Sequence, residues 1–312
     1  MKALKWLVVP ALPALAVGVA ACGGGGSSGG GGELAGEIRI DGSSTVAPIS
    51  EPIGALFSDE NSDTSVTVGT AGTGGGFERF CAGETDISDA SRPIEPEEAQ
   101  LCEENGVEYE EIVVANDALS VVVNPDNPVT CMSPDQLSEI YGEDADITSW
   151  SDVGDLDAPY DEDLEIFSPG ADSGTFDYFT DAVNGEEGVQ RSDGVQTSAD
   201  DNVIVTGVSG EEGGLGYAGF SFYEQNQDKL SAVSVDGGSG CVEPTSETIQ
   251  SGEYKPLSRP IFMYPATKAL ERPEVKAFLE FAIENHQKIS EAANIVPMSD
   301  EQATESETKV SG

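Results

Sequence analysis

The chain has 312 residues, 38% of them hydrophobic, and carries 58 acidic residues against 14 lysines and arginines, a formal net charge of −44 at pH 7. So acidic a surface repels nucleic acid and anionic lipid headgroups, which excludes a nucleic-acid partner and binding to a membrane surface through the folded part. The acidity favours a saline exterior habitat over a cationic ligand, and the length suffices for two globular lobes.

The N-terminus has the pattern of an export signal. Lys2 and Lys5 precede an apolar run that is too short to remain as a membrane span, and residues 19–22 are Val-Ala-Ala-Cys. This tetrapeptide resembles a bacterial lipobox, which implies that residues 1–21 are removed and that the sulfur of Cys22 carries a lipid. The alternative is a plain signal followed by an ordinary thiol. Residues 22–36 are rich in glycine and are expected to be a flexible tether.

Residues 37–105 alternate short apolar strands with segments of helical hydrophobic spacing. The predicted strands are 37–41, 65–69 and 85–88, and the predicted helices are 46–58, a segment through Phe77 and Phe80, and 96–105. Strands that alternate with helices predict a parallel or mixed sheet with helices on both faces. Ligands of such sheets lie outside the carboxyl ends of the strands.

The apolar segment 111–123 is interrupted at Asn116-Asp117 and is interpreted as a strand that leaves one lobe for the other. Residues 258–264 are expected to be the strand that returns. Other predicted elements are a helix at 133–141, a strand at 164–167, a helix through Phe176 and Phe179, and a helix from Pro273 to about Ala293. The acidic stretch 143–163 lacks the ligand spacing and central glycine of an EF-hand, so a solvated loop is preferred to a calcium site.

The predicted architecture is therefore α/β with two lobes, each a mixed sheet flanked by helices. Lobe I is expected to comprise residues 37–115 plus 233–303, and lobe II residues 116–232. Residues 304–312 are expected to be a polar, frayed tail.

Three turns rich in serine, threonine and glycine each follow a strand and precede a helix. They are Asp41–Thr45, Gly69–Phe77 and Ser168–Thr175. Small residues at a helix start let several backbone N–H groups converge on one point, which suits an anion. A single such turn is usually no more than a turn, but three together, with Arg92 between them, favour an anion site.

Four cysteines remain beyond Cys22, namely Cys81, Cys102, Cys131 and Cys241. In an exported chain they indicate two disulfides, for which three connectivities exist. Pairing Cys81 with Cys102 closes a short loop and is favoured, which leaves Cys131 with Cys241. The connectivity itself stays open at this point.

Catalytic chemistry has little support in the sequence. There is one histidine, His286, and no Gly-x-Ser-x-Gly, no Walker lysine and no His/Cys cluster with metal spacing. We therefore expect a binding protein rather than an enzyme, with no cofactor and no metal. A secreted phosphatase, and a sensor or adhesin for anions, are the alternatives.

Four motifs in order along the chain carry a resemblance to a known family. They are Gly-Ser-Ser-Thr-Val-Ala-Pro from Gly42, the Gly-Thr-Gly-Gly-Gly-Phe turn, Asp-Ile-Ser-Asp-Ala-Ser-Arg-Pro-Ile from Asp86, and Asp-Ser-Gly-Thr-Phe from Asp172. Together they resemble the phosphate-binding lipoproteins (PstS family) of the ABC phosphate importer, over residues 37 to about 300. The resemblance implies a two-lobed, type II periplasmic-binding-protein fold that closes on inorganic phosphate. It also implies a monomer that delivers phosphate to the transmembrane permease subunits, at the outer face of the cell membrane or in the periplasm.

The resemblance also implies the phosphate contacts. The candidates from the two lobes are Ser44, Thr45, Thr73, Ser91, Ser173, Gly174 and Thr175. Many members carry an arginine where this chain has Pro169, so Arg92 is the candidate cation. Some members carry an aspartate where this chain has Ser91, which leaves Asp89 as the nearest acidic candidate, either for phosphate or as a partner of Arg92. A carboxylate can accept the proton of phosphate but repels sulfate, which has none.

Overall fold

The computed structural model describes residues 34–312. The predicted signal peptide, Cys22 and most of the tether at 22–36 lie outside the described residues. Within the described part, no helix is both long enough and apolar enough to span a membrane.

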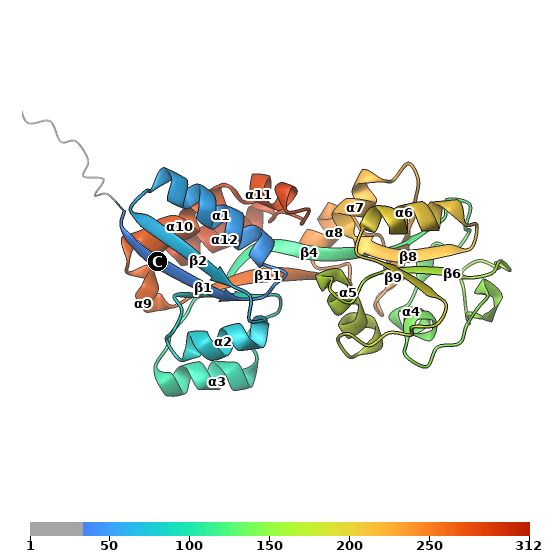
Figure 1. The fold of residues 1–312 in the computed structure, drawn as a ribbon, viewed down its shortest axis with the longest axis horizontal. Coiled ribbons are helices and arrows are strands. Elements are labelled where there is room, and N and C mark those ends of the chain that lie inside the picture. The colour runs from blue at the N-terminus through green and yellow to red at the C-terminus, as the bar shows by residue number, and fades with distance from the viewer. Residues whose placement is uncertain (1–33) are drawn as a thin grey trace, which may run out of the picture. The chain divides into compact units, whose positions relative to one another are not determined.

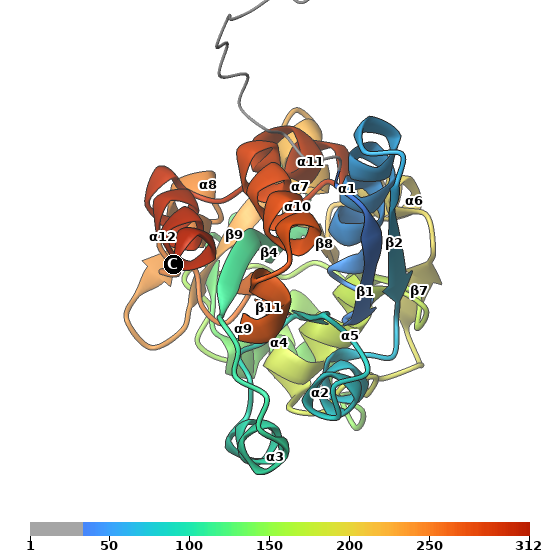
Figure 2. The ribbon, with the colours of Figure 1, turned by 90° about the vertical axis from the view of Figure 1, so that its left-hand side faces the viewer.

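The first lobe is a mixed sheet covered by helices on both faces (Figure 1). Its strands are β1 (Gly36–Gly42), β2 (Thr64–Gly69), β3 (Ile87–Ala90), β11 (Ser258–Pro265) and the first half of β4 (Ile112–Val123). Its helices are α1 (Ala47–Glu60), α2 (Thr73–Cys81), α3 (Pro96–Asn105), α9 (Thr267–Leu270), α10 (Pro273–Glu284), α11 (His286–Ala292) and α12 (Asp300–Ser311). Figure 2 shows α10 and α11 on one side of this sheet and α2 and α3 on the other.

The alternation of apolar residues explains this packing. Ile38 and Ile40 of β1 are buried in the same cluster as Ile49 and Phe57 of α1, because period-2 and period-3.6 spacing each place apolar side chains on one face. A separate cluster around Phe77 and Phe80 fills the space between the sheet and the pair α2 and α3.

The second lobe has its own sheet and core. Its strands are β5 (Cys131–Met132), β6 (Glu165–Pro169), β7 (Val195–Ser198), β8 (Gly214–Gly219), β9 (Ser231–Asp236), β10 (Cys241–Val242) and the second half of β4. Its helices are α4 (Pro134–Tyr141), α5 (Gly174–Phe179), α6 (Asp201–Gly210), α7 (Phe220–Gln225) and α8 (Ser246–Gln250), with a 3-10 turn at Trp150–Asp152 and a π turn at Thr180–Asn184. Trp150 and Tyr141 are among the buried side chains of the core.

The strands β4 and β11 run from one lobe into the other (Figure 1). They pair antiparallel from Ser258↔Ala118 to Met263↔Ile112, and β4 continues along β8 and β9. The strand order is β2-β1-β3-β11-β4-β8-β6-β7. Because β1 is parallel to both β2 and β3, the turns that follow these three strands lie at one edge of the sheet. The predicted fold class is confirmed.

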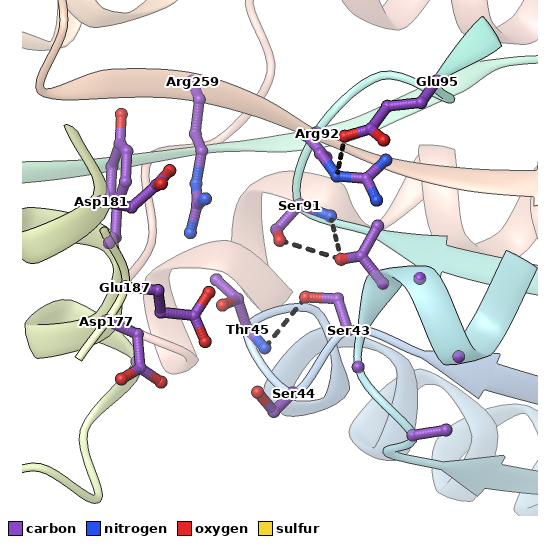
Figure 3. A pocket seen from close by; sticks show the side chains of 17 residues that line it. Ser43, Ser44, Thr45, Ser91, Arg92, Glu95, Asp177, Asp181, Glu187 and Arg259 are labelled. Carbon is purple, nitrogen blue, oxygen red and sulfur yellow. Dashed lines mark hydrogen bonds and ion pairs between the residues drawn. The ribbon is translucent and has the colours of Figure 1, made fainter. Parts of the chain in front are cut away.

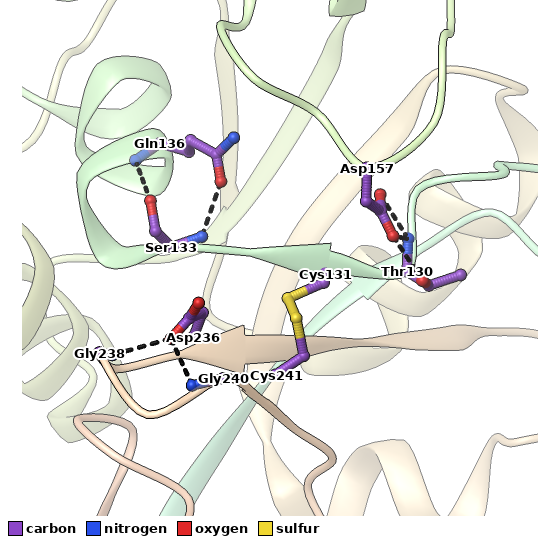
Figure 4. Close-up of a disulfide and its surroundings, with 9 residues drawn as sticks. All are labelled: Thr130, Cys131, Ser133, Gln136, Asp157, Asp236, Gly238, Gly240 and Cys241. Carbon is purple, nitrogen blue, oxygen red and sulfur yellow. Dashed lines mark hydrogen bonds between the residues drawn. A yellow bond between two sulfur atoms is a disulfide. The ribbon is translucent and has the colours of Figure 1, made fainter.

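Both predicted disulfides are present. Cys81–Cys102 joins α2 to α3 inside a buried cluster, and Cys131–Cys241 joins β5 to β10, which both pair with β9 (Figure 4). A cross-link of this kind restricts the unfolded chain, and the longer loop, with a sequence separation of 110, restricts it more.

The predicted strand that leaves one lobe for the other is present as β4, and the break in its apolar run does not interrupt it. Asn116 and Asp117 lie inside one continuous β4. The Asn116 side chain is buried, yet its amide donates to Pro297 O at 3.1 Å and to Gln302 Oε1 at 3.0 Å. Distant partners therefore satisfy a polar residue whose type favours a break in the strand.

The lobe boundary and the C-terminus also differ from expectation. Val233, Tyr254 and Leu257 pack in the second core, so the chain returns to the first lobe at β11 and not at residue 233. The predicted frayed tail at 304–312 belongs to α12, where Val310 is buried and the Ser306 hydroxyl donates to Val113 O at 2.9 Å. The predicted helix at 273–293 is interrupted at Asn285, between α10 and α11.

Candidate functional site

The predicted turns meet at one cleft of about 470 Å³ (Figure 3). The first lobe contributes Ser43 to Thr45, Ala71 to Gly75, Ser91, Arg92 and Glu95, and the second contributes Gly174, Asp177, Tyr178, Asp181 and Glu187. Arg259 of β11 completes the lining. Of the predicted residues, Ser44, Thr45, Thr73, Ser91, Arg92 and Gly174 therefore line a common space.

The turn after β1 is held by backbone hydrogen bonds to strand β3 and to the turn before α2. Ser43 N donates to Asp89 O at 2.9 Å, and Gly72 N donates to Gly42 O at 2.9 Å. The Ser43 hydroxyl accepts from Thr45 N at 3.2 Å, while the Ser44 side chain is exposed on the cleft. These contacts fix the conformation of the turn.

Asp41 ties two of the turns together from behind the cleft. Its Oδ1 atom accepts from Gly42 N at 2.8 Å and from Ala71 N at 2.9 Å. Its other oxygen pairs with Arg79, which neutralises this buried carboxylate. Sequence reasoning did not single out Asp41, because its role depends on a partner turn 30 residues away.

The N-terminus of α2 presents backbone donors to the cleft. The first-turn N–H groups of a helix have no acceptor within the helix, and here they belong to Thr73, Gly74 and Gly75, which line the cleft. The Thr73 hydroxyl accepts from Ser91 N at 3.2 Å and lies 3.1 Å from Ser91 Oγ. Thr73 and Ser91 thus form one hydroxyl pair on the first-lobe wall.

The second-lobe turn faces the first. Ser173 is the N-cap of α5, and its hydroxyl accepts from Thr175 N at 3.3 Å. A Cβ atom added to Gly174 would lie 3.5 Å from Thr45 Oγ1, so the two turns oppose each other closely. Ser173 and Thr175 flank this point but are outside the cleft lining.

Asp89 is not brought to the cleft. It is fully buried beneath the turn after β1, where its Oδ2 atom accepts from the Ser50 hydroxyl at 2.6 Å. Burial raises the pKa of Asp89 to about 7, with the Ser50 hydrogen bond opposing this shift and the charge of Asp41 adding to it. The expectation that Asp89 contacts an anion directly, or pairs with Arg92, therefore does not match its position.

Arg92 lines the cleft, but carboxylates occupy its guanidinium. Nη1 and Nη2 each lie 2.8 Å from a Glu98 oxygen, and Nε lies 3.2 Å from Glu95 Oε1. The hydrogen bonds that Arg92 donates to Glu98 raise the pKa of Arg92 above its ordinary value.

Sequence reasoning missed the remaining charged residues of the cleft: Arg259, Asp177, Asp181 and Glu187. Arg259 lies within a predicted strand, and nothing in the sequence distinguishes the three acids from the many other acidic residues of the chain. Burial raises the pKa of Asp177, and the nearby Arg259 lowers it by a smaller amount. Between residues 34 and 312, no group of three or more His, Cys, Asp or Glu residues could hold a metal ion.

Comparison with known proteins places the chain in a family. The profile of the PBP superfamily domain matches residues 27–286. The phosphate-binding protein PstS of Staphylococcus saprophyticus is 41% identical over 278 residues, which covers 88% of this chain and 84% of that protein.

Solved structures agree. A possible phosphate binding protein from Planctomyces limnophilus superposes with a TM-score of 0.83 at 40% identity, covering 89% of this chain and 98% of that one. A structure with bound phosphate, of a substrate-binding protein assigned to a phosphate ABC transporter in Clostridium perfringens, gives a TM-score of 0.55 at 28% identity, covering 85% and 100%. The chain therefore belongs to the PBP superfamily and, within it, to the PstS family of phosphate-binding proteins.

Proposed function

We propose that this protein captures inorganic phosphate outside the cytoplasm and delivers it to the transmembrane subunits of an ABC importer. The observation that carries the proposal is the convergence of hydroxyl and backbone N–H donors from both lobes on one cleft. Membership of the PstS family supports the same ligand.

The phosphate oxygens are bound by short-range donors. Ser44, Thr45, Thr73 and Ser91 supply hydroxyls from the first lobe, with the N–H groups at the start of α2. The turn Ser173–Thr175 supplies donors from the second lobe when the cleft closes. Such donors act at hydrogen-bond distance, where they outweigh the repulsion that the acidic surface exerts through salt-screened water.

Selectivity for phosphate over sulfate requires an acceptor in the cleft, and Asp177 is the best placed. It follows the Ser173–Thr175 turn on α5, lines the cleft and is only partly exposed. An ionised Asp177 accepts the proton of hydrogen phosphate, whereas sulfate offers no proton and leaves two acceptors facing each other.

The experiment that tests this function is a calorimetric titration of the phosphate-stripped protein. Phosphate is expected to bind with 1:1 stoichiometry, arsenate to compete, and sulfate to bind at least about tenfold more weakly, since an unpaired acceptor costs about 1–3 kcal/mol. Asp177→Asn should reduce the difference in binding affinity between phosphate and sulfate. The matched control is Glu143→Gln on the exposed acidic loop, which should leave this difference in affinity unchanged. Equal affinity of the unmodified protein for sulfate would contradict the proposal.

Closure of the lobes provides a second expected result. Donors from the two lobes lie on opposite walls of the cleft, so phosphate is expected to draw the lobes together. X-ray scattering should show a smaller radius of gyration with phosphate than without. Ser173→Ala combined with Thr175→Val should weaken binding and reduce this compaction. An unchanged radius in the unmodified protein would mean that the site lies within one lobe or that the free protein is already closed.

Anchoring by a lipid on Cys22, a location at the outer face of the membrane or in the periplasm, and a monomeric state are parts of the same proposal. Mass spectrometry of the exported protein would detect the lipid. The proposed role is binding without catalysis. Release of phosphate from an ester would instead favour the secreted phosphatase, and the absence of uptake defects in a deletion strain would favour a sensor or adhesin.

A further inference from the structure

The cleft contains two arginines whose guanidinium groups are in different states. Arg92 turns toward Glu95 at the edge of the cleft, whereas Arg259 extends from β11 into the space between Ser91 and Asp181 (Figure 3). Either arginine could therefore be the cation that binds an anionic ligand, and their contacts distinguish them.

The three guanidinium nitrogens of Arg92 all face carboxylates of its own lobe. Its two terminal nitrogens form a bidentate pair with Glu98 at 2.8 Å each, and Nε faces Glu95 at 3.2 Å. Glu98 also belongs to the capping box that starts α3, since it accepts from Glu95 N at 2.9 Å. The Cζ atom of Arg92 lies 5.9 Å from the centre of the Phe77 ring. Arg92 therefore fixes α3 against α2, and phosphate would have to break a complete salt bridge to use it.

Arg259 is held more loosely and from one side. Its Nε and Nη2 atoms lie 3.3 and 3.2 Å from the same oxygen, Asp117 Oδ2, on the neighbouring strand β4. Within residues 34–312, Nη1 makes no hydrogen bond. The Cζ atom lies 3.7 Å from the centre of the Tyr178 ring, so the planar group is fixed by stacking and keeps a free edge.

The position of Arg259 joins the two lobes. It lies on β11 opposite Asp117 of β4, the two strands that pass between the lobes, and it stacks on α5, which begins with the Ser173–Thr175 turn. Tyr178 is anchored in turn, because its hydroxyl donates to Pro256 O at 2.8 Å. A ligand that contacts both walls of the cleft would lie beside this guanidinium.

We propose that Arg259, and not Arg92, is the cation that binds phosphate, with Asp117 as the fixed counter-ion that orients it. The inference rests on the proposed function and names the charged residue of that site. Four carboxylates also line the cleft, those of Glu95, Asp177, Asp181 and Glu187. A cation that these acids do not saturate offsets their repulsion of an anion in the cleft.

The test is calorimetric titration with inorganic phosphate of the full chain and of two matched variants, Arg259→Gln and Arg92→Gln. Arg259→Gln is expected to weaken phosphate binding at least about thirtyfold, because a charged fork is lost. Arg92→Gln is expected to stay within about threefold of the affinity of the unmodified protein while lowering its thermal unfolding midpoint, because it loses the ion pairs with Glu95 and Glu98 and no contact to phosphate. The reverse order of affinities, or equal effects, would overturn the inference.

Two further variants allow for the case in which Arg259→Gln fails to fold with Asp117 left unpaired. Asp117→Asn should weaken phosphate binding, because Arg259 loses the carboxylate that orients it, but by less than about thirtyfold, because the guanidinium itself remains. The double variant Arg259→Gln/Asp117→Asn has no unpaired charge and should fold, yet bind at least about tenfold more weakly than Asp117→Asn. Equal binding by these two would also overturn the inference. Failure of the unmodified protein to bind phosphate would instead overturn the proposed function itself.

Discussion

Gly42→Ala is expected to lower the free energy of unfolding by about 3 kcal/mol or more, because overpacking and a strained backbone each cost about 1–3 kcal/mol. Gly42 has φ of +146°, and a Cβ atom there would lie 2.0 Å from Asp89 O. The clash is with backbone, so no side chain can turn away to relieve it. That same carbonyl holds Ser43 N, so the turn proposed to bind phosphate would move as well. Urea unfolding and a phosphate titration measure both effects.

Gly154→Ala is the matched control for this substitution. No atom lies within 4 Å of a Cβ added at Gly154, and its φ is not positive. The control should change the free energy of unfolding by less than about 0.5 kcal/mol. Similar stability of the two variants would show that β1 and β3 can separate at this point without cost.

Asp89→Asn is expected to remove a pH dependence of stability that the unmodified protein shows between about pH 4 and pH 7. The pKa of Asp89 is raised from 3.8 to about 7 in the folded protein, chiefly by burial. Below pH 4 the carboxyl is protonated in both the folded and the unfolded state, so no charge has to be removed from water when the chain folds. Between pH 4 and pH 7 the Asp89 carboxyl is ionised in the unfolded chain but stays protonated in the folded protein. The free energy of unfolding therefore falls as pH rises, by about 4 kcal/mol in total at about 1.4 kcal/mol per pKa unit.

The measurement is urea unfolding of both proteins at pH 4, 5.5, 7 and 8.5. The variant should gain stability relative to the unmodified protein as pH rises, with the difference levelling off above pH 7. Self-repulsion of the acidic surface affects both proteins equally and cancels in the difference. A difference that does not change with pH would mean that Asp89 is solvated, and that the single hydrogen bond from Ser50 does not describe its surroundings.

Much of this protein could be predicted from local patterns. The turns at Gly42–Thr45 and Gly72–Phe77 each follow an alternating apolar run. Their small residues are typical of places where two backbones approach closely. The pairing of Cys81 with Cys102 could also be predicted, because a separation of 21 residues makes the loop between them short and easy to close. The charge of −44 and the export signal by themselves narrow the class of protein, because neither depends on how the chain folds.

Tertiary structure decided which charged residues face the cleft. Arg92 and Arg259 are equivalent as residue types, but one meets Glu98 six residues away and the other meets Asp117 at a separation of 142 residues. Asp89 is two residues before Ser91, yet it lies within β3 with its side chain buried against Ser50, whereas Ser91 lies beyond the end of the strand and lines the cleft. A sequence specifies which groups can ionise, whereas burial and the position of distant partners determine which of them remain available to a ligand.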